Sequence, residues 1–411
     1  MVDVAIQFLV VASIIVFGFL GEEVFRRTGV PSFLWLIGIG VLLGPVFGVF
    51  PREALLPVLG VFAQLTLLIV LFYGGMDIRF SSLMGGGGRA ILQVLLYVLP
   101  SVIAIAMATS LVLHWPPLQS LIFSSMVGGE TTVAAMVPLS RSLKLPEKVI
   151  AFVTLEAAMN SIFSVVLFFA FETAFQAGAA SASAVVESIA ANFSVGIVGG
   201  ALFSLLWIFL LNRWRSQKYT YVLTVGLILL TYSLTSLAGG SGQLGVLVFG
   251  IVLGNYQSVG RLFGRQLNMD ALQGRLQLFH GEITFLMGTL FFVFLGLTFV
   301  INPSSVLTNL SIGLLILAVL LVIRRSAIAI STAGSEMRSY SNLLTLMCAM
   351  GLTPATLAVI SVNLNLPLAE SYLNLVTYII VFTNVVTAVG SVLRVRSKRN
   401  AGVPAEHEPA A

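Results

Sequence analysis

The sequence predicts an all-α polytopic membrane protein, and composition is the first observation behind this prediction. Of the 411 residues, 58% are hydrophobic and only 9% are charged, whereas about a quarter of the residues are charged in soluble domains. The second observation is a succession of apolar segments, about thirteen in all, each near the roughly 20 residues that cross a bilayer. Little of the chain remains for a soluble domain.

The expected spans are separated by short polar breaks. In chain order they cover residues 4–24, 31–50, 55–76, 90–113, 118–141, 148–174, 190–211, 219–237, 243–257, 277–300, 305–332, 341–362 and 369–393. The first is kept as a span because Gly21-Glu22-Glu23 follows it, where a signal peptide would have a small-residue cleavage site.

The distribution of basic residues predicts the orientation. Placing the first loop in the cytoplasm puts every Lys and Arg except Arg52 at or toward the cytoplasm, as the positive-inside rule requires. The amino terminus is then outside and the carboxyl terminus inside. The net charge of +5 is explained by this topology, so we expect no nucleic-acid partner. Residues 394–411 are expected to form a short, disordered cytoplasmic tail.

Two of the expected spans are interrupted. The fifth contains Gly128 and Gly129, and the twelfth contains Gly351, Thr353 and Pro354. Glycine loosens the helical backbone, and proline removes a helical hydrogen bond. If spans 1–6 and 8–13 are inverted repeats, the fifth and twelfth spans correspond, with the seventh as a connector. The sequence therefore predicts two crossed broken helices, which in transporters form ion sites near the midplane.

Glu130 is the deepest carboxylate in the expected spans, directly after Gly128-Gly129. A charged side chain at bilayer depth costs at least about 2.5 kcal/mol, so its default interpretation is a functional site. Burial favours the protonated form of a carboxyl group, whereas the ionised form is a hard oxygen ligand for a cation. We therefore predict a proton and monovalent-cation site at Glu130, with further oxygens from Thr131, Thr132, Asn160 and Ser161.

Glu156 is the second deep carboxylate, and Asn160 lies on the same helical face. Glu156 is a further candidate for binding the ion or proton. Alternatively, it forms a buried ion pair with Arg324 or Arg325 that organises the core. Glu130 has a structural alternative as well, in which its carboxylate accepts hydrogen bonds from backbone N–H groups freed at the helix break.

Enzymatic chemistry and cofactors are not expected. No nucleophile, base and orienting group occur together in a loop, and no Cys and His cluster has the spacing of metal ligands. The single cysteine, Cys348, excludes a disulfide within the chain.

Several segments together resemble the monovalent cation/proton antiporters, which include sodium/proton exchangers. They are Gly29–Ser32 followed by Gly40–Pro45, Leu71–Asp77, Val248–Asn255 and Phe291–Leu297. The resemblance implies the sodium/proton antiporter fold and a homodimer in a prokaryotic plasma membrane. It also implies that residues 1–393 form one transport unit, with a scaffold of spans 1–3 and 7–10 and a core of spans 4–6 and 11–13.

The family's ion-site motifs are only partly kept. Its Thr-Asp-Pro motif aligns with Thr131-Thr132-Val133, and its Glu-Ser-x-x-Asn-Asp motif aligns with Glu156 through Ser161. The Glu and the Asn are retained, but both aspartates are replaced, by Thr132 and Ser161. The family arginine that pairs with this glutamate corresponds to Arg324 or Arg325.

The resemblance implies a secondary active transporter that exchanges Na⁺ or K⁺ for protons by alternating access. Since both motif aspartates are absent, we expect Glu130 to substitute for them as the carrier. One carboxylate trading one proton for one monovalent cation predicts electroneutral exchange. Two alternatives stay open: a carrier of the same fold that lost proton coupling and moves another solute or a cation alone, and a membrane sensor that does not transport.

Overall fold

The structure is a computed structural model that describes residues 4–28, 31–49, 52–78, 87–178, 182–213, 220–262, 270–300 and 304–400. Within these ranges all regular secondary structure is helical, so the predicted all-α class is confirmed. Seven helices in the described ranges are long and apolar enough to cross a membrane: α3, α5, α8, α9, α10, α14 and α17. Together with the shorter apolar helices, they show an integral membrane protein.

Each predicted span corresponds to one helix or to consecutive helical pieces. The helices up to residue 178 are α1 (Val4–Thr28), α2 (Ser32–Val41), η1 (Leu42–Val46), α3 (Arg52–Asp77), α5 (Gly88–Val112), α6 (Pro117–Val127), α7 (Val133–Ser142) and α8 (Glu147–Gln176). In η1, α2 widens into a π-helical turn around Pro45, because proline has no backbone N–H to continue the α-helical pattern.

The second part of the chain continues the same pattern. Its helices are α9 (Ala182–Arg213), α10 (Thr220–Leu237), α11 (Gly242–Gly254), α12 (Tyr256–Leu262), α13 (Asp270–Leu297), α14 (Val306–Ser331), η2 (Glu336–Tyr340), α15 (Ser341–Leu346), α16 (Leu352–Asn363) and α17 (Ala369–Asn400). Helix α17 extends beyond the predicted span end at residue 393, so residues 394–400 of the expected disordered tail are helical. Residues 401–411 lie outside the described residues.

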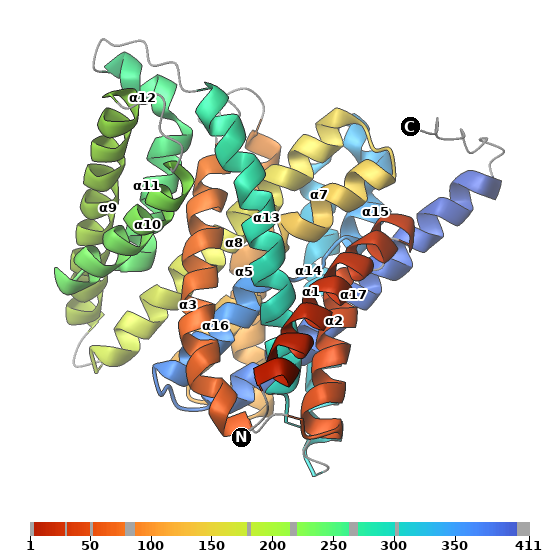
Figure 1. Cartoon of the computed structure of the whole chain (residues 1–411). Helices are drawn as coiled ribbons and strands as arrows, with labels where there is room; N and C mark the ends of the chain where they lie inside the picture. The colour runs from red at the N-terminus through yellow and green to blue at the C-terminus, as the bar shows by residue number, and fades with distance from the viewer. Residues whose placement is uncertain are drawn as a thin grey trace.

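The helices pack mainly within two groups. In one, α3, α9 and α10 surround α11, while α13 packs against α1, α2 and α3. In the other, α5, α6, α7 and α8 pack together, and α14, α15, α16 and α17 join them. Figure 1 shows α9 to α12 at the left edge and α14, α15 and α17 on the right. The groups meet chiefly where α16 packs on α3 and α8 packs on α9.

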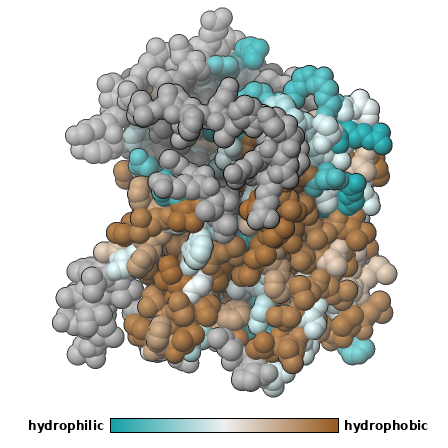
Figure 2. Space-filling view, turned by 90° about the vertical axis from the view of Figure 1, so that its right-hand side faces the viewer, coloured by the Kyte–Doolittle hydropathy of each residue, from teal (hydrophilic) through white to brown (hydrophobic). Residues whose placement is uncertain are grey.

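The outer surface is suited to lipid. Large apolar side chains are exposed on many helices, including Leu111 on α5, Leu237 on α10 and Leu307 on α14. Figure 2 shows apolar residues covering the middle and lower part of one face, with hydrophilic residues gathered near its upper edge. Such a surface is stable in hydrocarbon, which solvates apolar side chains as well as the protein interior does.

Both predicted helix breaks are present. The fifth span divides into α6 and α7 around residues 128–132, and the twelfth divides into α15 and α16 around residues 347–351. The two unwound segments lie against each other, since the backbone N–H of Thr132 donates to the carbonyl oxygen of Ala349 at 2.9 Å. The broken helices therefore cross in the interior. The inverted-repeat relation between the two halves stays a prediction.

Candidate functional site

The first break depends on its two glycines. Gly129 has a φ of +83°, in the left-handed region that favours glycine. Helix α5 also lies close, because a Cβ on Gly129 would be 2.8 Å from the Cα of Val98 and one on Gly128 would be 2.5 Å from a methyl of Val102. These glycines let the unwound backbone pass directly over α5 and bring Glu130 into the interior.

Glu130 is fully buried at the crossing. The hydroxyl of Ser161 on α8 donates to Oε1 of Glu130 at 3.0 Å, and the backbone of Gly351 also interacts with this carboxyl group. The second oxygen, Oε2, is buried and has no hydrogen-bond partner in the described part of the chain. A buried carboxylate oxygen without a partner is costly, so this position is suited to a proton or a bound cation.

Hydrogen bonds join α8 to the first break next to this carboxyl group. Asn160 donates from Nδ2 to Oγ1 of Thr131 at 2.9 Å, while its Oδ1 is buried without a partner among the described residues. Ser161 also approaches the carbonyl oxygen of Thr131 at 3.4 Å. The structure thus brings Glu130 and Thr131 together with Asn160 and Ser161, a second pair 29 or more residues later in the chain.

Glu156 lies in a separate, charge-compensated cluster. Arg324 on α14 approaches it with two nitrogens, Nη1 to Oε1 at 2.7 Å and Nη2 to Oε2 at 3.3 Å. Both side chains are 1% exposed. Arg324 also donates from Nε to the carbonyl oxygen of Leu344 on α15 at 3.0 Å, and its guanidinium lies 4.9 Å from the ring centre of Tyr97. The ion pair therefore ties α8, α14, α15 and α5 together.

Arg325 does not take part in this pair. Its side chain points to the exposed face of α14 and donates from Nη1 to Oδ1 of Asn342 at 2.7 Å. Of the two arginines predicted for the pair, only Arg324 reaches Glu156. Arg324 compensates the charge of Glu156, whereas the carboxyl group of Glu130, at the crossing, has no cationic partner within the described ranges.

A cavity of about 510 Å³ reaches the crossing from between the two helix groups. Its inner end is lined by Thr132, Ser161 and Thr353, and two acidic residues, Glu22 and Asp77, line it near the ends of α1 and α3. Ser161 therefore connects the cavity with the buried carboxyl group of Glu130. It lines the cavity, and its hydroxyl donates to Glu130. An ion at the inner end of the cavity would meet the hydroxyl groups of Thr132, Ser161 and Thr353 before it reached the carboxylate of Glu130.

The second break differs in one respect from the prediction. Pro354 was expected to interrupt the twelfth span, but the unwound residues are 347–351 and α16 begins at Leu352. Pro354 lies in the first turn of α16, where a backbone N–H has no intrahelical partner and proline is tolerated. Gly351 is the residue at the crossing, because a Cβ there would lie 2.6 Å from Oγ1 of Thr132.

Gly351→Ala is expected to lower the free energy of unfolding by about 1–3 kcal/mol, because the added methyl group would collide with Thr132 in a closely packed interior. The melting temperature of the purified protein in detergent measures this effect. Gly38→Ala is the control, since a Cβ at Gly38 meets nothing within 4 Å. Equal melting temperatures for the two variants would contradict the close crossing.

Several groups that complete these clusters were not predicted from the sequence. Gln93 on α5 is buried and lies 3.4 Å from Oε1 of Glu156, and Ser331 donates to Oε1 of Gln93 at 2.8 Å. On α17, Thr383, Asn384 and Thr387 bind the second unwound segment. The signal in the sequence was that Thr387 lies four residues after Thr383 and three after Asn384, so that the three share one helical face of a largely apolar span.

Comparison with known proteins decides the family. The family described as "Sodium/hydrogen exchanger, transmembrane" matches residues 10–394. The chain belongs to this family. Its members are ion antiporters and not enzymes, as the sequence analysis predicted.

Individual relatives in this antiporter family are more distant. The K(+)/H(+) antiporter NhaP2 of Shewanella oneidensis is 27% identical over 394 residues, which cover 91% of this chain and 64% of that protein. NhaP2 of Shewanella baltica is also 27% identical, over 401 residues covering 91% of this chain and 63% of the relative. The chain thus spans less than two thirds of the length of these relatives.

A solved structure shows the fold. The sodium proton antiporter MjNhaP1 from Methanocaldococcus jannaschii, determined at pH 8, superposes with a TM-score of 0.74 at 19% sequence identity and covers 97% of each chain. The predicted sodium/proton antiporter fold is therefore confirmed.

Proposed function

We propose that this protein exchanges a monovalent cation, Na⁺ or K⁺, for protons by alternating access, with Glu130 as the carrier. The observation that carries the proposal is the contrast between the two buried carboxylates. Glu156 is neutralised by Arg324, whereas Glu130 lies at the helix crossing with one oxygen unpartnered among the described residues. Only a group whose charge is not already compensated gains from binding a proton or a cation.

The coupling follows from the chemistry of one carboxyl group. Ionised, Glu130 attracts a cation, and the oxygens of Thr131, Asn160 and Ser161 replace part of its hydration shell. Protonated, the same group is neutral and has lost its attraction for the cation. Because the proton and the cation exclude each other at Glu130, each passage of the site across the membrane carries one of them. One proton is then exchanged for one monovalent cation, and the exchange is electroneutral. Thr132, which lines the cavity, is the entry to this site.

The two helix groups supply the moving parts. We assign α1, α2, α3, α9, α10, α11 and α13 to the scaffold and α5 to α8 with α14 to α17 to the core. This division is supported by the packing within each group and by a cavity that lies between them. In this proposal the scaffold forms a homodimer in a prokaryotic plasma membrane, with the amino terminus outside and the carboxyl terminus in the cytoplasm.

The function is tested in proteoliposomes that contain a pH-sensitive dye. Adding Na⁺ or K⁺ to vesicles with an acidic interior is expected to raise the internal pH, and comparing the two ions measures selectivity. Electroneutral exchange is expected to give no transport current on a solid-supported membrane while the pH changes. A current with the sign of the moving cation would contradict the one-carboxylate scheme. The absence of any cation-driven pH change would refute the proposed function.

A second candidate is a carrier of the same fold that has lost proton coupling. It is favoured by the hydroxyl groups of Thr132 and Ser161, which occupy the positions where the related family motifs have aspartate. Uptake of a radiolabelled cation that is insensitive to an imposed pH gradient would support this candidate over the exchanger.

A further inference from the structure

Helix α17 carries three fully buried polar residues that face the second unwound segment: Thr383, Asn384 and Thr387. The backbone N–H of Cys348 donates to Oγ1 of Thr387 at 3.1 Å, and the N–H of Met350 donates to Oγ1 of Thr383 at 3.3 Å. Asn384 donates from Nδ2 to the carbonyl oxygen of Met350 at 2.8 Å. These side chains replace the hydrogen bonds that the unwound backbone cannot make to itself.

Asn384 relates to the second break as Asn160 relates to the first. Each asparagine lies on the helix that follows the broken one, and each donates from Nδ2 to the unwound segment, to Thr131 in one case and Met350 in the other. In both, Oδ1 is buried without a partner among the described residues. Each amide therefore holds one break, Asn160 through the side-chain hydroxyl of Thr131 and Asn384 through the backbone carbonyl oxygen of Met350.

The Met350 peptide is connected to the transport site over a short path. Gly351 follows Met350 directly, packs against Thr132 and interacts through its backbone with the carboxyl group of Glu130. Ala349, on the other side of Met350, accepts the hydrogen bond from the backbone of Thr132. A shift of the backbone at Met350 would thus displace all three of these contacts between the second break and the first.

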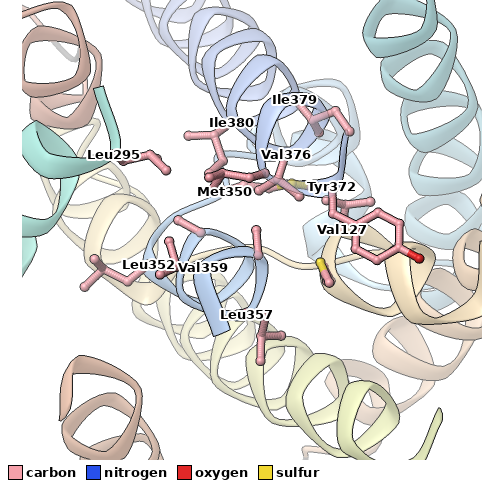
Figure 3. Packing of buried hydrophobic residues seen from close by; sticks show 14 of the residues in the cluster. Val127, Leu295, Met350, Leu352, Leu357, Val359, Tyr372, Val376, Ile379 and Ile380 are labelled. Carbon is pink, nitrogen blue, oxygen red and sulfur yellow. The ribbon is translucent and has the colours of Figure 1, made fainter. Parts of the chain in front are cut away.

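The side chain of Met350 cannot position this peptide by itself. It lies among Val376 and Ile380 of α17 in the apolar core (Figure 3), and methionine in such surroundings adapts easily to several shapes. Directional contacts on this peptide come instead from its hydrogen bonds to Thr383 and Asn384. Both backbone hydrogen-bonding groups of Met350, its N–H and its carbonyl oxygen, are therefore held by α17.

We propose that Asn384 is a positioning residue for cation binding, which acts by holding the Met350 peptide so that Gly351 and Thr132 are correctly placed against Glu130. This inference rests on the proposed exchange function. Asn384 would not touch the ion. Its loss would weaken cation binding by misplacing groups of the first break, while the transporter would still fold and move.

Asn384→Leu tests this role, because leucine keeps the branching of asparagine at Cγ but cannot donate a hydrogen bond to Met350. The Michaelis constant for the cation, measured in proteoliposomes, is expected to rise about tenfold, as for the loss of a buried hydrogen bond worth roughly 1.4 kcal/mol. The maximal rate is expected to change less. Thr383→Val, a nearly isosteric change that removes the acceptor for the N–H of Met350, is also expected to raise the Michaelis constant.

Asn374→Ala is the matched control, an asparagine on α17 about three helical turns earlier, for which the wild-type Michaelis constant is expected. The proposal is overturned if the wild-type protein exchanges ions and both the Asn384 and Thr383 variants keep the wild-type constant. It is also overturned if they lower only the maximal rate and the melting temperature, as a purely structural role would. If the wild-type protein shows no exchange, the proposed function has failed instead.

Discussion

Glu130→Gln is expected to reduce cation-driven proton exchange by at least about 100-fold, the usual effect of removing an essential proton-transfer group. Glutamine has the same shape and can still accept the hydrogen bond from Ser161. Glutamine can neither release a proton nor compensate the charge of a cation. Proton binding and cation binding at this position are therefore both lost. The initial rate of internal alkalinisation in proteoliposomes, normalised to the amount of inserted protein, measures the loss.

The control for this variant is Glu187→Gln, which neutralises an exposed carboxylate on α9 and is expected to transport at the wild-type rate. Glu130→Gln is expected to keep a wild-type melting temperature in the absence of cation, because it retains the packing of the site. The assignment of the carrier is wrong if transport survives in Glu130→Gln and is lost in Glu156→Gln with the protein still folded.

Arg324→Ala is expected to lower the free energy of unfolding by about 3–5 kcal/mol, since removing one partner of a buried ion pair leaves the other charge uncompensated. Glu156 would remain in the interior beside the neutral amide of Gln93, and α15 would lose its link through Leu344. The melting temperature in detergent and the yield of folded protein measure this effect.

Arg325→Ala is the matched control, one residue along the same helix. Its side chain is exposed and its hydrogen bond is to Asn342, so the expected change is within about 0.5 kcal/mol. The double replacement Glu156→Leu with Arg324→Met is expected to recover much of the lost stability, because apolar residues can replace a buried ion pair. Similar losses for Arg324→Ala and Arg325→Ala would refute the structural role assigned to the pair.

Membrane spans were predictable because the bilayer imposes a strong local rule. A chain that crosses hydrocarbon must be helical and apolar for about 20 residues, so hydropathy alone located the helices. The first break was predictable because Gly128 and Gly129 precede a buried carboxylate, whereas a glycine pair alone does not suffice: Gly199 and Gly200 lie within the unbroken helix α9. The position of the second break was less certain, because Pro354 is compatible with both a helix interruption and a helix start.

The candidate site was predictable only as a set of residue types. Glu130, Asn160 and Ser161 are recognisable as polar groups at bilayer depth, but their meeting depends on how the first break lies against α8. The choice between Arg324 and Arg325 depends on the rotation of α14 about its axis, because adjacent residues on a helix point about 100° apart. The role of the polar residues of α17 is visible only from their hydrogen bonds to the unwound segment beside them.

By itself, the sequence determined that this protein is a helical membrane protein, where its spans lie and which two are broken. These properties follow from local composition, because the hydrocarbon of the bilayer favours apolar side chains at each position of a span. The tertiary structure decided that Arg324 compensates Glu156, that one oxygen of Glu130 has no hydrogen-bond partner among the described residues, and that α17 holds the second break. Charge compensation and hydrogen bonding at these positions join residues far apart in the chain, so only the packed helices determine which buried carboxylate is paired with an arginine.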